Sequence, residues 1–382
     1  MSSPYHAKTL KGFEQILAGE LKEIGAEDIR PVNRGVDFSG SNSMMYKANY
    51  CARTALRILK PIARFKAFNE EKLYRKIREI DWSDYMSYKH SFAVDAVTFS
   101  KVFRNNHYVE LKIKDAIADQ FRENTSLRPS VDLKGADIRI NVHVQETFFT
   151  ISLDSSGDSL HRRGYRKFAH PASLSEVLAA GMVMMTGYKG ERPLRNPMCG
   201  SGTIAIEAAM IASGVYPGAM GRNYSFQHWP DFDPVLFERL IESLPGKNIP
   251  AHPITASDID PEAVRMAKNN IRVAGLGDAV EVTKENFLTR EKIADPSLVI
   301  MNPPYGERIE VEDIEALYSG IGTTLKHRFP GSEAWIYSAS LDAFRFIGLK
   351  PDKKIPLHNA GLEGKFMKYK LFSGTRKSFV ST

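Results

Sequence analysis

Cysteine is scarce in this 382-residue sequence, and its two cysteines, Cys51 and Cys199, do not form a Cys-x-x-Cys pair. Neither a disulfide framework nor a zinc site is therefore indicated. Long apolar runs are also lacking, because none approaches the roughly 18 residues that a membrane-spanning helix requires. Lys8, Lys11 and Glu14 interrupt the apolar residues near the start of the chain, where a signal peptide would have its core. These absences predict a cytoplasmic protein that has no metal site and no membrane anchor.

An excess of one charge sign is confined to the first part of the chain. Residues 1–170 carry 28 lysines and arginines against 21 acidic residues, a net charge of +7, whereas residues 171–382 carry 24 of each kind. A basic region of this kind suits a polyanionic partner such as nucleic acid. It is equally typical of a mildly basic, solvated surface, so charge alone does not decide between the two interpretations.

The length predicts two to three domains, and the first 160 residues are interpreted as two small α/β units that meet near residue 60. In the first unit, the spacing of apolar residues predicts helices over 10–25 and 41–60 and an extended hairpin over 30–40. In the second unit we expect helices over 64–82 and 110–124 and strands over 91–99, 137–144 and 147–154. The strand over 137–144 alternates apolar and polar residues, which predicts that one of its faces is in water.

From residue 171 onward, helices alternate with buried strands, and this alternation predicts a parallel sheet covered on both faces. We expect strands at 192–197, 253–260, 279–287, 297–302 and 333–339, and helices at 175–188, 201–214 and 261–276. Residues 214–252 interrupt the pattern. We interpret them as a surface insertion that could also shape a substrate cleft.

The segment NPMCGSGT (196–203) connects a predicted strand to a predicted helix. Gly200 and Gly202 permit a tight turn and a close approach of a ligand to the backbone, and the start of the helix offers unpaired N–H groups. The spacing matches neither the G-x-x-x-x-G-K-[ST] loop of triphosphate-binding proteins nor the G-x-G-x-x-G motif of dinucleotide-binding ones. Taken alone, the segment is either a ligand-binding loop or an ordinary strand-to-helix turn.

Polar side chains end the next two predicted strands. Asp258 lies where a carboxylate can accept hydrogen bonds from both hydroxyl groups of a ribose, whereas Asp260 precedes Pro261 and is better explained as a helix N-cap. Asn286 ends the following strand, where its amide could read the edge of an adenine ring or serve as an ordinary turn residue.

A fourth predicted strand stops abruptly at the tetrapeptide Asn302-Pro303-Pro304-Tyr305. The glycine loop, Asp258, Asn286 and this tetrapeptide therefore all fall at carboxyl ends of strands. Ligands bind at that edge of an open parallel sheet, so the coincidence predicts a single binding site.

The motifs NPMCGSGT, SDID, KENF and NPPYGER together resemble those of class I S-adenosylmethionine-dependent methyltransferases that modify exocyclic amino groups, for which Asn-Pro-Pro-Tyr is a specific marker. Over almost the whole chain, the sequence resembles more closely the bacterial THUMP-domain RNA guanine-N2 methyltransferases of the RlmL family, and it is similar to their N-terminal methyltransferase half. Further segments that carry this resemblance are RGVDFSG, ARTALRILKPIARFKA, LHRRGYR, CGSGTIAIEAAMIA and KNNIRVAG.

The resemblance implies three domains: a ferredoxin-like unit over 1–60, a THUMP RNA-binding domain over 61–160 and a Rossmann-like methyltransferase domain over 161–382. It implies S-adenosylmethionine as the cofactor and N2 of a guanine in RNA as the methyl acceptor. Ribosomal RNA is the expected partner, transfer RNA is the alternative, and the oligomeric state is not indicated. A noncatalytic RNA-binding or ribosome assembly factor is the competing hypothesis from another class.

The resemblance also assigns residues to the site. Those expected at the cofactor are Asn196, Pro197, Cys199, Gly200, Ser201, Gly202, Asp258, Ile259 and Asn286. Family members usually have an acidic residue where this chain has Asn196, and often Asp where it has Asn286. In catalysis, Asn302 and the Pro303 carbonyl would accept hydrogen bonds from the amine, the prolines Pro303 and Pro304 would hold the backbone, and Tyr305 would stack on the base.

Basic residues in two segments are the candidates for contact with RNA phosphates. From the first segment we expect Arg64, Lys66, Lys72, Arg75 and Lys76 to bind RNA, and from the second Arg162, Arg163 and Arg166. A solvated protein surface is the alternative for each of them.

Overall fold

The computed structural model describes residues 2–167, 174–305, 313–359 and 361–372. They form two compact units. The N-terminal unit consists of Met1–Thr9, Leu17–Leu160 and Arg222–Leu244, and the C-terminal unit of Leu10–Ile16, His161–Gly221 and Pro245–Thr382. Among the described residues, every helix is too short or too polar to span a bilayer.

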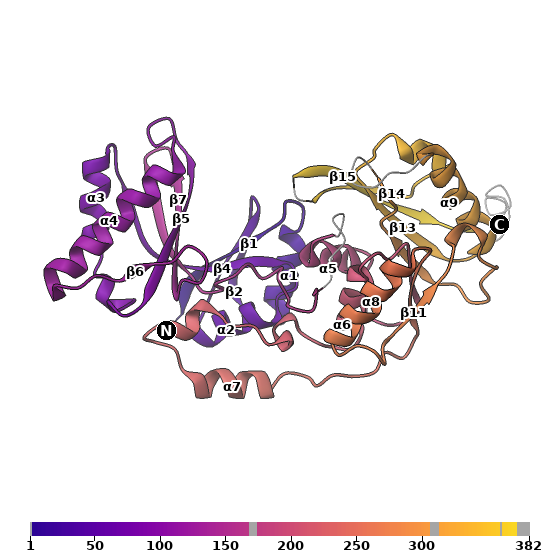
Figure 1. Cartoon of the computed structure of the whole chain (residues 1–382), viewed down its shortest axis with the longest axis horizontal. Helices are drawn as coiled ribbons and strands as arrows, with labels where there is room; N and C mark the ends of the chain where they lie inside the picture. The colour runs from indigo at the N-terminus through magenta and orange to yellow at the C-terminus, as the bar shows by residue number, and fades with distance from the viewer. Residues whose placement is uncertain (1, 168–173, 306–312, 360, 373–382) are drawn as a thin grey trace. The chain divides into compact units, whose positions relative to one another are not determined.

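The N-terminal unit is built on one eight-stranded sheet with the order β2-β3-β1-β4-β8-β7-β5-β6 (Figure 1). Its strands are β1 (Ser3–Thr9), β2 (Glu27–Val32), β3 (Gly35–Gly40), β4 (Ala55–Lys66), β5 (Ser91–Phe99), β6 (Ser130–Val131), β7 (Ile138–Gln145) and β8 (Phe148–Asp154). The helices are α1 (Glu14–Glu23), whose first turn belongs to the other unit, α2 (Asn42–Cys51), α3 (Glu70–Arg78), α4 (Asn106–Thr125) and α7 (Pro234–Glu242), with 3-10 turns η1 (Trp82–Asp84) and η3 (Ser225–His228).

The long strand β4 corrects the helix predicted over 41–60. That helix ends at Cys51, and the chain then enters β4, which pairs with β1 along one edge and with β8 along the other. The register of the β4–β8 pair shifts between Pro61 and Ala63. Because a bulge interrupts the two-residue alternation of a strand, β4 has no clean strand pattern in the sequence. The helix predicted over 64–82 is likewise shorter, since α3 covers only Glu70–Arg78.

The strand β7 confirms the segment predicted over 137–144, but its polar face is in water only in part, since of the predicted polar residues only His143 is exposed. Arg139 and Asn141 lie on the predicted polar face, yet both are buried. Arg139 forms an ion pair with Asp95 of β5 at 3.3 Å, and Asn141 accepts a hydrogen bond from the Lys8 ammonium at 3.0 Å. Neighbouring strands supply these partners, so the alternation in β7 alone does not predict the burial.

The predicted insertion at 214–252 contributes its middle part to the N-terminal unit. Phe226 of η3 stacks on Tyr46 of α2 with ring centroids 4.6 Å apart, and Phe237 of α7 meets the same ring edge-on at 5.7 Å. The Tyr46 hydroxyl also accepts a hydrogen bond from the backbone N–H of Asp233, which caps α7. This aromatic cluster fastens residues 222–244 to α2.

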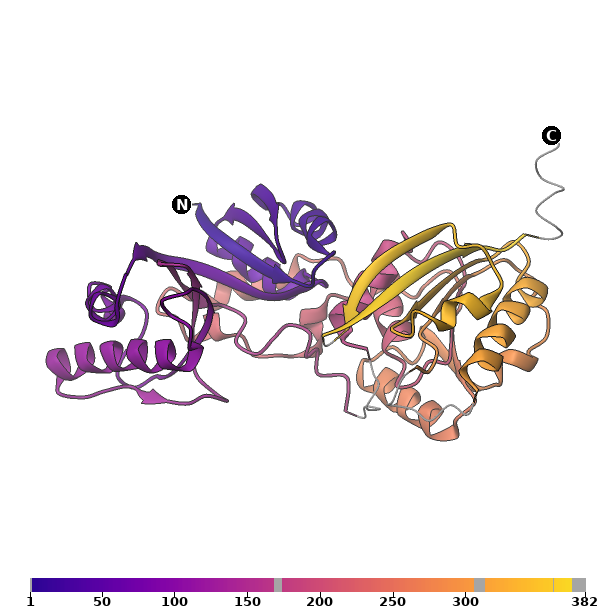
Figure 2. The same cartoon turned by 90° about the horizontal axis from the view of Figure 1, so that it is seen from above.

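The C-terminal unit is built on a seven-stranded sheet with the order β11-β10-β9-β12-β13-β15-β14. The first five strands in this order pair in parallel, and β15 runs antiparallel to both β13 and β14 (Figure 2). The strands are β9 (Leu194–Pro197), β10 (Ile254–Asp258), β11 (Val280–Lys284), β12 (Leu298–Met301), β13 (Glu333–Ser338), β14 (Lys353–Asn359) and β15 (Leu362–Lys370). All five strands predicted for this unit are confirmed.

Helices cover the C-terminal sheet. They are α5 (Glu176–Met185), α6 (Thr203–Ala212), α8 (Pro261–Val273) and α9 (Ile314–Arg328), with 3-10 turns η2 (Pro217–Met220), η4 (Phe287–Thr289) and η6 (Ala343–Ile347). Val299 and Met301 of β12 pack in one buried cluster with Tyr318, Ile321 and Leu325 of α9. The chain runs outward from β9 through β10 to β11 and then returns to place β12 on the other side of β9. The sheet order therefore reverses between β9 and β12, and such a switch point is where open α/β sheets bind ligands.

Candidate active site at the switch point of the parallel sheet

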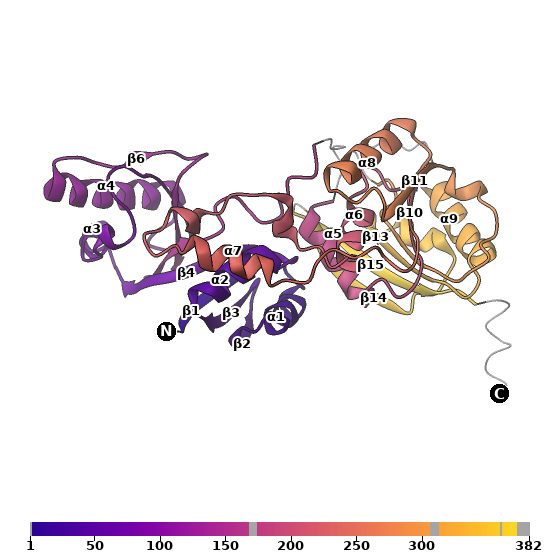
Figure 3. The same ribbon diagram turned by 90° about the horizontal axis from the view of Figure 1, so that it is seen from below.

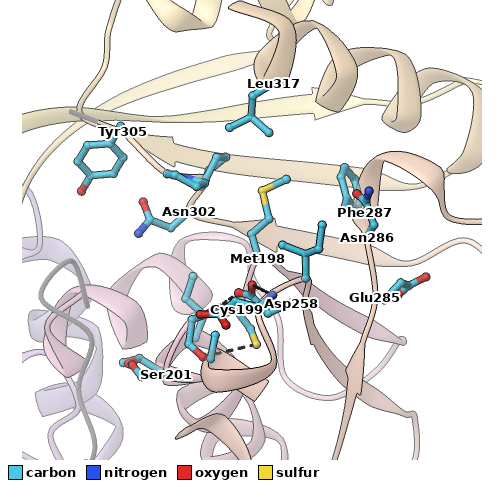
Figure 4. Close-up of a pocket in the computed structure, with 18 of the residues that line it drawn as sticks. Met198, Cys199, Ser201, Asp258, Glu285, Asn286, Phe287, Asn302, Tyr305 and Leu317 are labelled. Carbon is cyan, nitrogen blue, oxygen red and sulfur yellow. Dashed lines mark hydrogen bonds between the residues drawn. The ribbon is translucent and has the colours of Figure 1, made fainter. Parts of the chain in front are cut away.

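A cavity of about 410 Å³ lies at the carboxyl ends of the parallel strands of the C-terminal unit (Figure 4). Its walls contain residues from the segments after β9, β10, β11 and β12, as the sequence predicts. The lining residues are Leu174, Met198, Cys199, Gly200, Ser201, Thr203, Ile204, Asp258, Ile259, Asp260, Ala263, Glu285, Asn286, Phe287, Leu288, Asn302, Pro303, Pro304, Tyr305 and Leu317. All four predicted catalytic residues belong to this set.

The glycine loop between β9 and α6 takes a sharply turned path. Met198, Gly200 and Gly202 have positive φ angles of 54°, 53° and 81°. A Cβ atom on Gly202 would approach the Ala267 side chain of α8 to 3.1 Å, so glycine serves both the turn and the close packing of α6 on α8. A Cβ atom placed on Gly200 would meet no atom within 4 Å apart from its chain neighbours, so there is open space on that side of the loop. Met198 lacks glycine's conformational freedom, and its left-handed backbone is a strain typical of functional loops.

Asp258 holds the glycine loop in place. One of its carboxylate oxygens accepts a hydrogen bond from the Gly200 N–H at 2.9 Å, and the other accepts from the Asp260 N–H at 3.1 Å. A carboxylate has about four lone-pair sites, so two remain for hydroxyl groups of a ligand. Asp260 itself caps α8 through the Glu262 N–H at 2.9 Å, which confirms its interpretation as an N-cap.

Asn286 lines the far end of the cavity and starts the short turn η4. Its side-chain oxygen accepts a hydrogen bond from the Leu288 N–H at 3.0 Å, so the side-chain NH₂ is the group left to face a ligand. Phe287 and Leu288 add apolar surface beside it. An apolar wall with one amide suits a heteroaromatic ring such as adenine.

Asn302 presents an unsatisfied acceptor. Its side-chain oxygen is buried and has no hydrogen-bond partner within the described part of the chain. A buried polar atom without a hydrogen bond destabilises the fold unless a ligand or water supplies the missing donor. Tyr305 follows two prolines later and meets the ring of Tyr337 edge-on, with centroids 6.4 Å apart. Residues 306–308 of the NPPYGER motif lie outside the described residues.

Asn196 and Pro197 lie in β9, behind the cavity wall, and with Gly202 they are the predicted cofactor residues that do not line it. Asn196 is only 1% exposed, and its NH₂ group donates to the Ile300 carbonyl of β12 at 2.8 Å. The backbone pairing of β9 with β12 stops one residue earlier, at Arg195. The Asn196 amide therefore extends the junction between the two strands, and its own oxygen is buried without a hydrogen-bond partner among the described residues.

The Cys199 thiol is kept neutral. Burial, and after it the negative charge of Asp258, raise its pKa far above the usual range. A neutral thiol is a poor nucleophile, so we assign this cysteine a structural role in the glycine loop. Its backbone N–H contributes by donating to the Ser257 carbonyl at 3.0 Å.

The residues present fit S-adenosylmethionine. In Figure 4, Asn286 and Glu285 lie toward one end of the cavity, Asp258 and Cys199 in the middle and Asn302 toward the other end. This succession matches the order of adenine, ribose and sulfonium in the cofactor, and the volume lies within the usual range of about 300–1,000 Å³ for small-molecule sites. A ligand could fill the open space beside Gly200 and could donate a hydrogen bond to the Asn302 oxygen, which has no partner among the described residues.

The sequence reasoning missed the apolar part of the site. Ile204, Ala263, Leu288 and Leu317 line the cavity without belonging to a motif, and Met198 lines it although the sequence assigned it no role. Met198 lies inside the motif NPMCGSGT, and Ile204, Ala263 and Leu288 lie within three residues of a motif, so neighbourhood in sequence was a usable signal for them. Leu317 comes from α9, and only the three-dimensional fold brings it to the cavity.

The predicted RNA contacts of the N-terminal unit lie on two sides of its sheet. Arg64 and Lys66 are exposed at the end of β4. Lys72, Arg75 and Lys76 belong to α3, where Lys76 forms an ion pair with Glu79. The structure therefore does not bring these five cations together into one patch.

The predicted RNA contacts of the C-terminal unit are mostly internal. Arg163 is 1% exposed and donates to the Glu207 carboxylate of α6 at 3.3 Å, as does the Tyr165 hydroxyl at 2.8 Å. Arg166 donates to the Glu176 carboxylate at 2.6 Å. Arg163 is almost inaccessible to a phosphate, because it is buried and its charge is paired with the Glu207 carboxylate. Arg162 is exposed.

Comparison with known proteins identifies all three parts of the chain. Residues 163–368 match the family described as the RMKL-like methyltransferase domain, residues 67–154 match the THUMP domain, and residues 5–59 match the RlmL ferredoxin-like domain. These matches confirm the resemblance stated from the motifs.

Relatives match over nearly the whole chain. "Putative RNA methyltransferase slr0064" of Synechocystis is 38% identical over 97% of both chains. The ribosomal RNA large subunit methyltransferase K/L of Syntrophotalea carbinolica is 34% identical over 96% of this chain, which spans only 53% of that longer protein. Among solved structures, SMU.472, "a putative methyltransferase complexed with SAH", has a TM-score of 0.84 and 26% identity and covers 98% of this chain, with 99% of its own chain matched. The fold prediction, with a Rossmann-like methyltransferase sheet, is confirmed.

Proposed function

The chain belongs to the RMKL-like methyltransferase family, whose cofactor is S-adenosylmethionine, and we propose that it methylates the exocyclic N2 of a guanine in large-subunit ribosomal RNA. The observation that carries the proposal is the buried oxygen of Asn302 in the cavity wall, which has no hydrogen-bond partner among the residues that the structure describes. The THUMP domain and the names of the two relatives support RNA as the substrate. The ribosomal relative favours ribosomal over transfer RNA.

The proposed chemistry must activate a weak nucleophile, because the lone pair of an exocyclic guanine amine is delocalised into the ring. S-adenosylmethionine, when bound, supplies an electrophilic methyl group on a positively charged sulfur. The Asn302 oxygen and the Pro303 carbonyl would each accept a hydrogen bond from the amine and draw its nitrogen toward tetrahedral geometry. The same two oxygens would stabilise the positive charge that develops on the nitrogen.

The tetrapeptide supplies rigidity as well as acceptors. Pro303 and Pro304 restrict the backbone φ angles on either side of the acceptor pair, so the two oxygens stay aimed. Tyr305 is held edge-on against Tyr337 and would offer its ring to the target base. The base must leave its stack in RNA to reach this cavity.

The remaining lining residues are proposed to hold the cofactor. Asp258 would accept hydrogen bonds from ribose hydroxyls while keeping Gly200 in place, and the Asn286 NH₂ would donate to a ring nitrogen of adenine. Phe287, Leu288 and the other apolar residues of the wall exclude water from the adenine.

Nucleoside mapping tests this function. Ribosomal and transfer RNA from a strain that lacks the gene would be digested and compared with wild-type RNA by mass spectrometry. We expect one N2-methylguanosine to disappear from large-subunit ribosomal RNA, and to return with the wild-type gene but not with Asn302→Ala. Loss of the same nucleoside from transfer RNA would show that transfer RNA is the substrate. Loss of N6-methyladenosine would overturn the proposed chemistry.

A further inference from the structure

One face of the N-terminal sheet is left open over strands β4, β8, β7 and β5. The opposite face is covered by α4, which packs on β5, and α3 packs against α4 (Figure 3). On that covered face Phe149, Val142 and Val144 are buried. The alternate residues point the other way, and at the strand ends they form a row of four that faces solvent: Lys66, Phe148, Gln145 and Phe99.

Two phenylalanine rings dominate this open face. Phe99 is 58% exposed and Phe148 is 54% exposed, which is unusual for side chains that normally occupy a core. The Phe99 ring lies 5.7 Å from the His143 ring, which is exposed on the same face. Strands β8 and β5 are two strand spacings apart, so the two phenylalanines stand about 10 Å apart. That separation offers two places for flat ligands.

The charges beside Phe148 are positive, whereas the exposed Glu146 lies next to Phe99, whose carbonyl accepts a hydrogen bond from the Glu146 backbone N–H at 2.8 Å. The Lys66 ammonium lies 4.4 Å from the centre of the Phe148 ring, and Arg64 is exposed two residues earlier on the same face. Burial, followed by the charges of Lys8 and His6, lowers the pKa of His143, which favours the neutral form of its ring. The carboxylate of Asp95, farther along the same face, is paired with Arg139. The face therefore combines two partly exposed aromatic rings with the cations of Arg64 and Lys66 and suits a flat anionic ligand.

We propose that this open face binds unpaired nucleotides of the RNA substrate, with bases stacked on Phe99 and Phe148 and phosphates held by Arg64 and Lys66. Aromatic stacking and backbone cations are the two components of single-strand recognition. A protein partner would be expected to need a larger apolar patch without the cations. The inference rests on the RNA substrate of the proposed function and adds which surface and which kind of RNA structure are recognised.

Binding of a fluorescent 12-nucleotide oligoadenylate to the full chain tests the proposal, with a 12-base-pair RNA duplex as the comparison. Stacking is worth about 1–3 kcal/mol per base, which corresponds to roughly 5- to 150-fold in affinity. We expect the double variant F99A/F148A to bind the single strand at least tenfold more weakly while its duplex binding stays unchanged. The variant F99Y/F148Y keeps both rings and should bind like the wild type. Tyr108→Ala is the matched control, since that ring is 39% exposed on α4, the helix over the opposite face.

The charges are tested separately by the salt dependence. Arg64→Gln should reduce the slope of log K against log salt by about 0.7 for the single strand, whereas F99A/F148A should leave the slope unchanged. Equal single-strand affinity of wild type and F99A/F148A, or no oligoadenylate binding by the wild type, would overturn the proposal. If the wild type methylates ribosomal RNA while F99A/F148A binds normally, only this inference fails. If the wild type methylates no RNA, the proposed function fails.

Discussion

The carboxylate of Asp258 accepts a hydrogen bond from the backbone N–H of Gly200 at 2.9 Å, which joins the end of β10 to the glycine loop after β9. One aspartate thus shapes the loop and faces the cavity at the same time. Its position at a strand end is readable from the sequence, but its partner is not, because the two residues are 58 positions apart.

Asp258→Asn should therefore weaken cofactor binding. The amide retains one oxygen, so a loop contact or a ribose contact loses its charged acceptor, at a cost of about 1.5–3 kcal/mol. We expect the Kd for S-adenosylmethionine in isothermal titration calorimetry to rise roughly 10- to 100-fold. The control is Asp313→Asn, because Asp313 caps α9 and asparagine is also a good N-cap. Unchanged affinity in Asp258→Asn would show that the carboxylate is not needed.

Asn196→Asp should make the protein more dependent on its cofactor. Aspartate has no N–H group for the Ile300 carbonyl and would place a buried charge where Asn196 has an unpartnered oxygen. The free protein should melt at a lower temperature, because an unpaired buried charge is costly. The ammonium group of S-adenosylmethionine would offset part of this cost, so saturating cofactor should raise the Tm more in the variant than in the wild type. An equal rise in Tm on cofactor binding in the variant and the wild type would show that Asn196 does not contact the cofactor.

Arg163 is predicted to stabilise the fold and not to bind RNA. Arg163→Met leaves the buried Glu207 carboxylate without its guanidinium partner, and breaking a buried pair costs about 3–5 kcal/mol. Tyr165→Phe removes one hydrogen bond to the same carboxylate and should cost about 1 kcal/mol. Urea unfolding followed by tryptophan fluorescence measures both losses.

The neighbouring Arg162→Met is the matched control for this pair. Arg162 is exposed, so its replacement should change the free energy of unfolding by less than about 1 kcal/mol. Equal destabilisation by Arg163→Met and Arg162→Met would contradict the assigned role of the buried pair.

Asp37 should make the N-terminal unit sensitive to acid. The hydrogen bond from His6 at 2.7 Å, and after it the one from Arg30 at 2.8 Å, outweigh burial and lower the pKa of Asp37 to about 2, from a usual value of 3.8. A depressed carboxyl pKa stabilises the fold above pH 4 and loses this contribution as the pH falls toward 2. Because a third of the side chain is exposed, solvent screening limits the contribution to about 1 kcal/mol.

The measurement for Asp37 is urea unfolding at pH 6 and at pH 2.5. Asp37→Asn should be less stable than the wild type at pH 6, and the difference should shrink at pH 2.5. Asp115→Asn, an exposed change on α4, controls for the removal of a surface charge. A difference that stays the same at both pH values would contradict the assigned contribution.

The sequence predicted which polar residues meet at one edge of the sheet because the strands of the C-terminal sheet are short and are ended by polar motifs. Asp258, Asn286 and Asn302 each follow such a strand, and parallel topology brings strand ends to one edge. The same reasoning failed for β4, where the bulge after Pro61 removes the alternation. It also failed for Arg163, because a basic run such as HRRGYRK does not show which arginine finds a buried carboxylate.

Residues 222–244 mark another limit of sequence reasoning. The aromatic residues Phe226 and Phe237 are visible in the sequence, but nothing near them shows that their partner is Tyr46 of the N-terminal unit. Contacts between segments nearly 200 residues apart depend on the tertiary fold alone. The burial of Arg139 and Asn141 in β7 has the same origin, since Asp95 and Lys8 come from other strands.

The most direct test of the account is a split between binding and methyl transfer at Asn302. Wild type and Asn302→Ala would be compared by calorimetry with S-adenosylmethionine and by transfer of a labelled methyl group to ribosomal RNA, followed by nucleoside mass spectrometry. We predict that Asn302→Ala binds the cofactor within about threefold of the wild type, a difference below 1 kcal/mol, while methyl transfer falls at least 100-fold, as expected when a group that acts on the developing charge is removed. The wild-type product should be N2-methylguanosine. Parallel loss of cofactor binding and transfer, or a methyl group on another atom, would contradict the account.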